Sequence, residues 1–97
     1  MSHDYRLADD SVVRSHWDDA LERGGEMLVL AGNDVTLLSP IAAEAALAAR
    51  GGITVGDLER HLLAEFGAPD EGDTESAVRA LVDTLVGRGV MSVEPAE

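Results

Sequence analysis

The side chains best suited to chemistry in this chain are its three histidines, which could bind a metal or move a proton. They are His3, His16 and His61. No two of them stand at a spacing that would bring both rings to one metal from a single helix or strand. Solvent-exposed histidines are the favoured interpretation, and we expect neither a metal site nor a cofactor.

Two pairs of adjacent aspartates and one serine complete the candidate catalytic groups. Asp9-Asp10 and Asp18-Asp19 are pairs in sequence only, because adjacent side chains do not converge on one substrate atom. Ser39 stands before a proline, where its hydroxyl is better explained as a helix N-cap than as a nucleophile. The chain has no nucleophile elbow, phosphate-binding loop or dinucleotide-binding turn. These residues predict a protein that is not an enzyme.

Length and charge narrow the class further. The chain has 97 residues, enough for one domain with one core. Its formal net charge of −12 repels a phosphate backbone, so nucleic acid is not an expected partner. The acidity serves either solubility alone or also the attraction of a basic partner. The chain has no cysteine, which excludes disulfides and thiolate chemistry.

No segment of the sequence is typical of a membrane or targeting element. The apolar runs are far shorter than the ~20 residues that a membrane-spanning helix needs. Residues 1–10 are too polar for a signal peptide. We therefore expect a cytoplasmic protein that does not bind a membrane.

Three strands are predicted in the first half of the chain. β-Branched and aromatic residues favour a strand over residues 11–17, and residues 18–25 look like a turn or a short helical loop. Residues 26–31 and 35–38 are apolar runs on either side of Gly32-Asn33-Asp34, a tight-turn signal that predicts a β-hairpin.

Three helices are predicted to follow. Ser39 can cap a helix over residues 41–50, and Thr54 with Asp57 resembles a capping box that opens a helix ending at Phe66. Asp73 or Thr74 can cap a third helix that ends near residue 88, and residues 90–93 form a last strand or an extended tail.

These elements predict an α+β domain, in which three strands precede three helices. We expect a flexible N-terminal segment over residues 1–10, a single domain over residues 11–93 and a C-terminal tail over residues 94–97.

The order of the elements, together with several short motifs, resembles the PqqD family of peptide chaperones, also called recognition elements for ribosomally made precursor peptides. The resemblance runs from about residue 12 to residue 93. It is carried by the hairpin, by Leu37-Leu38-Ser39 leading into an alanine-rich helix, by Ile53-Thr54-Val55-Gly56-Asp57-Leu58, by residues 77–85 and by Gly89-Val90. Trp17 ahead of the hairpin suggests the branch that accompanies proteins related to the HPr kinase.

The resemblance implies a winged-helix-like fold, in which a three-stranded antiparallel sheet is followed by three helices. It implies a noncatalytic module that binds the leader segment of a precursor peptide. It also implies a peptide-modifying enzyme as a partner, such as a radical SAM enzyme, a protease, a cyclodehydratase or a kinase-like protein. The leader would add as a strand to the sheet edge and lie against the third helix.

The residues that would line this groove follow from helix and strand geometry. The third strand offers its free edge at Val35, Thr36, Leu37 and Leu38. At 100° per residue, a stripe of the third helix is expected to face the core, and its members are Ala77, Val78, Leu81 and Leu85. One flank of that stripe is expected to meet the peptide, through Arg79, Val82 and Val86. The alternative is that the two valines widen the core face and that Arg79 is solvated.

Two other functions stay open at this stage. A winged-helix DNA-binding regulator would share the architecture, but the second and third helices lack the basic surface that such a protein needs. A regulatory or assembly subunit would use the same edge to bind a partner enzyme without maturing a peptide.

Overall fold

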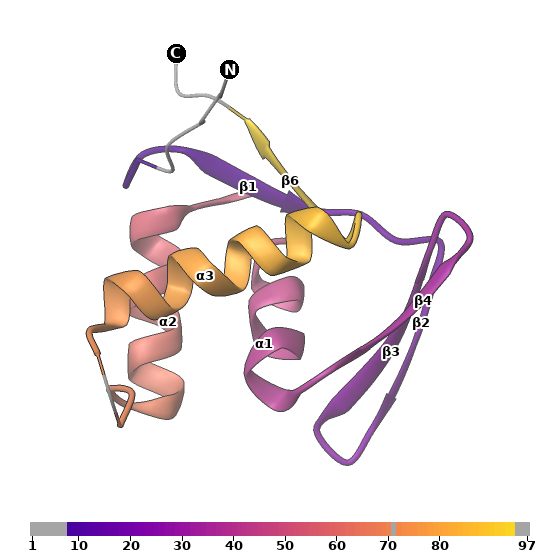
Figure 1. The fold of residues 1–97 in the computed structure, drawn as a ribbon, viewed down its shortest axis with the longest axis horizontal. Coiled ribbons are helices and arrows are strands. Elements are labelled where there is room, and N and C mark those ends of the chain that lie inside the picture. Colours follow the sequence, from indigo (N-terminus) through magenta and orange to yellow (C-terminus); the bar gives the residue numbers. More distant parts are fainter. Residues whose placement is uncertain (1–7, 71, 95–97) are drawn as a thin grey trace.

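The computed structural model describes residues 8–70 and 72–94, which form two antiparallel sheets and three helices (Figure 1). The elements, in chain order, are β1 (Val12–Ser15), β2 (Asp19–Arg23), β3 (Glu26–Ala31), β4 (Asp34–Leu38), α1 (Pro40–Ala48), β5 (Ile53–Thr54), α2 (Val55–Phe66), α3 (Thr74–Gly87) and β6 (Met91–Glu94). The α+β class and the three helices are confirmed. The winged-helix-like arrangement stays a prediction.

The sheet of β2, β3 and β4 is a meander joined by two tight turns. Gly24 and Gly25 both have positive φ, which suits the turn that joins β2 to β3. Gly32 has φ +64° at the first central position of the turn between β3 and β4, where glycine is favoured. The predicted hairpin is confirmed, with β3 in the centre of the sheet.

The segment that precedes β3 differs from its prediction. Residues 18–25 were expected to form a loop, but Asp19–Arg23 pairs with β3 as strand β2. This strand has no β-branched residue, so its own propensity is weak. Pairing with β3 and the Gly24-Gly25 turn therefore stabilise β2 as a strand, although its own residues do not favour one.

β1 belongs to a second sheet, not to the hairpin sheet. It lies between β5 and β6, and Val13 pairs with both Ile53 and Val93. The single expected sheet is thus two three-stranded sheets, because β1 finds partners on both sides in segments far along the chain. The predicted last strand is confirmed as β6.

Each helix begins at a side chain that accepts a hydrogen bond from a backbone N–H of its first turn. The hydroxyl of Ser39 accepts from the Ala42 N–H, and the hydroxyl of Thr54 accepts from the Asp57 N–H. The carboxylate of Asp73 accepts from the Ser76 N–H at 2.7 Å. The three predicted caps are therefore confirmed, because each cap satisfies an N–H that the helix itself leaves unpaired.

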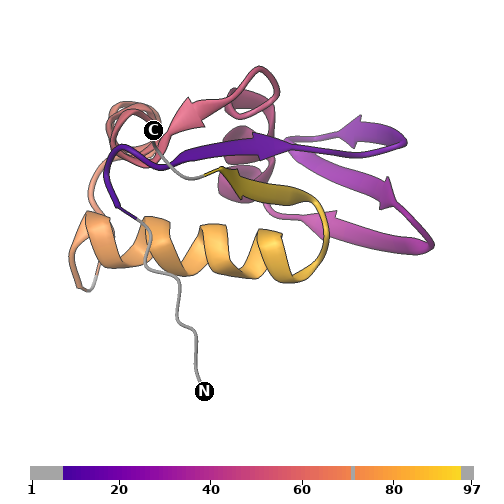
Figure 2. The same ribbon diagram turned by 90° about the horizontal axis from the view of Figure 1, so that it is seen from above.

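The alanine-rich helix α1 lies at the centre of the molecule, and the hairpin sheet projects to one side of the helices (Figure 2). Four of its alanines are buried, and α1 contacts β1, β3, β4 and α2. Small side chains let these elements approach the helix closely. The largest fully buried side chains around it include Met27, Leu58 and Leu85.

The two ends of the described chain are attached to the domain. The Gly56 N–H donates to the carbonyl oxygen of Asp9 at 2.9 Å, although residues 1–10 were expected to be flexible. Glu94 lies in β6 and pairs with Arg14 at 2.8 Å. The rest of the expected terminal segments, residues 1–7 and 95–97, lies outside the described residues. No helix within residues 8–70 and 72–94 is long and apolar enough to cross a membrane.

Candidate functional site

The candidate site is the outer edge of β4. Strand β4 pairs with β3 on one side only, and in the described part of the chain no strand pairs with its other side. The C-terminal strand β6 pairs with β1 instead. An unpaired strand edge presents rows of backbone N–H and C=O groups that a guest strand can complete.

The direction of the backbone groups along this edge follows from one hydrogen bond on β3. The Asp18 N–H donates to the carbonyl oxygen of Leu30 at 2.7 Å, so the backbone of Leu30 is directed toward β2. Leu30 pairs with Val35, and backbone directions alternate along antiparallel strands. The N–H and C=O groups of Val35 and Leu37 therefore point to the free edge, whereas those of Thr36 and Leu38 are directed toward β3.

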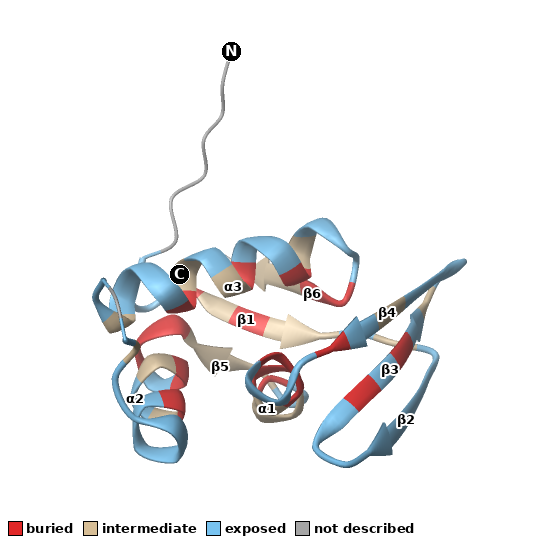
Figure 3. Ribbon diagram, turned by 60° about the horizontal axis from the view of Figure 1, so that its bottom comes forward, coloured by how far each residue is buried: buried red, intermediate tan, exposed pale blue. Residues whose placement is uncertain are grey.

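The hairpin sheet has many exposed residues, drawn as pale-blue stretches of its strands in Figure 3, and several of them are large and apolar. Cross-strand partners share a face, and Leu28 lies between Leu21 and Leu37. In the next row, Leu30 lies between Asp19 and Val35. The side chains of Leu21, Val35 and Leu37 are 59%, 65% and 61% exposed. We call this surface the outer face, and its five large aliphatic residues are Leu21, Leu28, Leu30, Val35 and Leu37.

The outer face was missed from the sequence, although a signal was present. Met27 and Val29 are buried while Leu28 and Leu30 are exposed, so the apolar run of β3 is apolar on both sides. A strand of an exposed antiparallel sheet normally alternates apolar and polar residues. The continuous apolar run of β3 is thus the sequence signal for an apolar outer face.

The four predicted strand residues divide between the two sides of the sheet. Val35 and Leu37 lie on the outer face, while Leu38 is buried in the core. Thr36 is half-buried on the inner side, and its buried hydroxyl oxygen has no hydrogen-bond partner among the described residues. The edge and the outer face thus meet at Val35 and Leu37.

The three predicted helix residues are not brought to β4. Val82 is 0% exposed in the core, so the core alternative holds for it. Val86 is half-buried and packs against the core. Arg79 forms ion pairs with Asp9 and Glu75, each at 3.0 Å. The N-terminal half of α3 lies beside α2, on the opposite side of the molecule from β4 (Figure 1).

The rotation of α3 explains this difference. The buried stripe is centred on Val78, Val82 and Leu85, while Leu81 is half-buried and Ala77 is exposed. The expected core stripe was therefore displaced toward Ala77 by part of a turn. Periodicity finds the apolar face of a helix, but valines on its flank leave the centre of that face ambiguous.

An apolar pocket of about 290 Å³ lies between the end of α2, the first turn of α3 and the start of α1. It is lined by Ile41 of α1, by Phe66 at the end of α2 and by Ala77 of α3, among others. Ile41 follows closely on the end of β4. Ala77, and not Arg79, is therefore the residue on the flank of α3 that borders this pocket.

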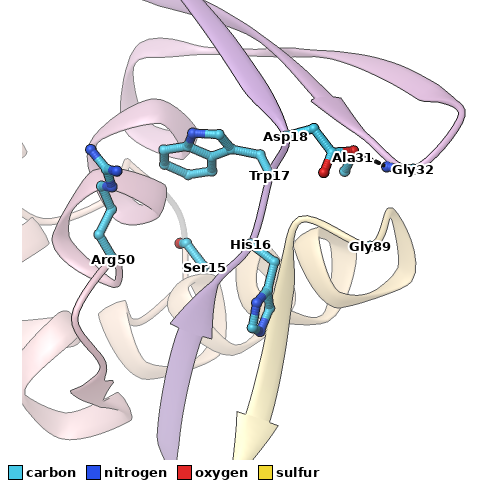
Figure 4. Close-up of a pocket in the computed structure, with 8 residues that line it drawn as sticks. All are labelled: Ser15, His16, Trp17, Asp18, Ala31, Gly32, Arg50 and Gly89. Atoms are coloured by element: carbon cyan, nitrogen blue, oxygen red, sulfur yellow. Dashed lines mark hydrogen bonds between the residues drawn. The ribbon is translucent and has the colours of Figure 1, made fainter.

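A more polar pocket of about 430 Å³ lies where the two sheets join (Figure 4). The Arg50 guanidinium carbon lies 5.2 Å from the centre of the Trp17 ring, a cation–π distance. His16 points away from both and bonds to Ser92 at 2.7 Å. The Asp18 carboxylate accepts from the Gly32 N–H at 3.1 Å. These contacts fix residues 16–18, the segment between the two sheets, to β6, to the hairpin and to Arg50 just after α1.

No cluster of three or more metal-binding side chains occurs in residues 8–70 and 72–94. His61 instead bonds to Glu44 at 2.7 Å, which joins α2 to α1. Comparison of the chain with protein-family models, with curated proteins and with solved structures found no match. The inference about function accordingly rests on the geometry of the site.

Proposed function

We propose that this protein is a noncatalytic module that binds an extended peptide by strand addition to the free edge of β4. Following the resemblance to the PqqD family, the peptide is the leader of a ribosomally made precursor, which the module presents to a modifying enzyme in the cytoplasm. The observation that carries the proposal is the unpaired edge, where the backbone groups of Val35 and Leu37 face outward.

The composition of β4 favours this edge over that of β2, the other edge of the sheet. β2 carries three charged side chains, Asp19, Glu22 and Arg23, whereas residues 35–38 of β4 carry none. Charged side chains discourage strand addition, and an uncharged edge permits it. β4 is thus the edge that is open to a guest strand.

The surroundings of an added strand indicate which side chains it should carry. Its alternate side chains would extend the outer face beside Val35 and Leu37, which favours apolar residues there. After the end of β4, Ile41 of the protein lines the apolar pocket that Ala77 also lines. The favoured ligand is an extended peptide with apolar residues at alternate positions.

The competing functions have less support. The net charge of −12 opposes binding to DNA. An assembly subunit would use the same edge but would bind its partner enzyme without any peptide, so binding of an isolated leader peptide separates the two.

The test compares Val35→Pro with Val35→Ala. Proline removes the outward N–H and places its ring at the edge, while the bonds between β4 and β3 are kept because that N–H faces away from β3. Alanine shortens the same side chain and keeps the N–H. The probe is a synthetic leader peptide from a short reading frame beside the gene for this chain, and the measurement is isothermal titration calorimetry.

We expect Val35→Pro to weaken binding about tenfold or more, and Val35→Ala to weaken it only about threefold, because a net hydrogen bond is worth ~1 kcal/mol and the ring also obstructs the strand. Circular dichroism checks that both variants fold. Equal affinities for the two variants, or no saturable binding to the original chain, would overturn the proposal.

A further inference from the structure

The outer face of the hairpin sheet is a second surface without a partner in the described structure. Its apolar residues extend over all three strands, from Leu21 on β2 to Leu37 on β4. A strand added to β4 would lie beside this face without covering it, because an added strand continues the sheet in its own plane. The peptide therefore leaves Leu21, Leu28 and Leu30 exposed.

The outer face carries few charges of its own, and the protein around it is strongly acidic. The strand registers place Asp19, Arg23 and Glu26 on this face, whereas Glu22 and Asp34 lie on the other side of the sheet, opposite Met27 and Ala31. Asp19 shares a row with Leu30, and Glu26 pairs with Arg23 at the end of the sheet. Asp19 is therefore the charge next to the apolar rows, in a molecule whose net charge is −12. An apolar face in such a field is complementary to an apolar surface flanked by basic side chains.

The dimensions of the face match a single helix. Three strands ~4.8 Å apart give a width of ~10 Å, close to the diameter of a helix with its side chains. The rows of Leu28 and Leu30 are two residues apart on β3, or ~7 Å, near the ~6 Å between residues i and i+4 of a helix. A helix satisfies its own backbone groups and needs no strand edge.

We propose that the outer face binds an amphipathic helix of a partner protein, with an apolar stripe flanked by lysine or arginine. This inference rests on the proposed function, since it assigns a surface for the modifying enzyme while β4 holds the peptide. A second copy of this chain fits less well, because two molecules of net charge −12 repel each other.

The test uses a synthetic amphipathic helix of about 18 residues, with leucines at i, i+4, i+7 and i+11 and lysines beside them. A matched peptide carries glutamate in place of each lysine. The protein variants are Leu21→Gln, on the outer face, and Ala20→Gln, the neighbouring exposed residue on the other side of β2. Nuclear magnetic resonance titration locates the site, and calorimetry measures affinity.

We expect the lysine peptide to bind with saturable shifts at Leu28 and Leu30, and the glutamate peptide not to bind. Leu21→Gln should weaken binding by about tenfold, as loss of a central apolar contact does, whereas Ala20→Gln should bind like the original chain. Val35→Pro and Val35→Ala should bind the lysine peptide equally, so the outcome is independent of strand addition at β4.

Three results would overturn the inference. The first is that the lysine peptide does not saturate the protein, and the second is that Leu21→Gln binds this peptide as tightly as Ala20→Gln does. The third is a dimer of the unmodified chain in sedimentation experiments that Leu21→Gln dissociates, since the face would then belong to a second copy.

Discussion

At the scale of single residues, two ionised carboxylates fix the end of β6 and the start of α3. The hydrogen bond from Arg14 holds the pKa of Glu94 below its ordinary value and joins β1 to β6. The backbone N–H of Ser76 likewise lowers the pKa of Asp73 at the start of α3. Both carboxylates stabilise the fold in their ionised form.

The lowered pKa of Asp73 predicts that part of the free energy of unfolding is lost at low pH. Its contribution is complete above the ordinary value of 3.8 and is lost as the pH falls through the lower pKa of the folded state. Asp73→Asn keeps a cap that does not titrate. Urea unfolding at pH 7 and at about pH 2.5 should show a smaller loss of stability for Asp73→Asn than for the original chain. An equal loss would contradict the role of this carboxylate.

The buried position of Val82 predicts an effect on stability alone. Val82→Ala removes two buried methyl groups and should lower the free energy of unfolding by about 2 kcal/mol. Affinity for the leader peptide should stay within about twofold, because Val82 does not reach the surface. Chemical denaturation and calorimetry measure the two quantities. If Val82→Ala lost affinity for the peptide but kept its stability, Val82 would contact the peptide and the assignment to the core would be wrong.

At the scale of elements, strong local signals were read correctly from the sequence and long-range pairing was not. Gly32-Asn33 predicted the turn after β3, and Ser39, Thr54 and Asp73 predicted the helix starts, since turns and caps depend on neighbouring residues. Strand β2 was missed because its order comes from β3. Segments distant in sequence also decide which sheet β1 joins, and no local pattern encodes that choice.

The candidate site shows the same division. Val35 and Leu37 were expected at a free edge, and the structure places both there. Arg79 was expected to face the peptide, but its guanidinium forms an ion pair with Asp9, which is far from Arg79 in the sequence. The rotation of α3 depends on how its flanks pack against α1 and α2, which periodicity alone does not determine.

At the scale of the whole molecule, the two sheets have separate roles. The sheet of β5, β1 and β6 closes the domain with the chain's own terminal strands, which leaves the hairpin sheet open at β4 and on its outer face. The net charge of −12 surrounds this open sheet with negative potential. A negative potential attracts basic surfaces and repels phosphate groups, in keeping with the proposed partner helix.

Amide hydrogen exchange over the whole chain, with and without saturating leader peptide, tests strand addition most directly. An added strand would bond the outward N–H groups of Val35 and Leu37, whose exchange should slow by about tenfold or more. The N–H groups of Thr36 and Leu38 already face β3 and serve as the internal control, with little change expected. A saturated complex in which Val35 and Leu37 exchange as fast as in the free protein would contradict strand addition at β4.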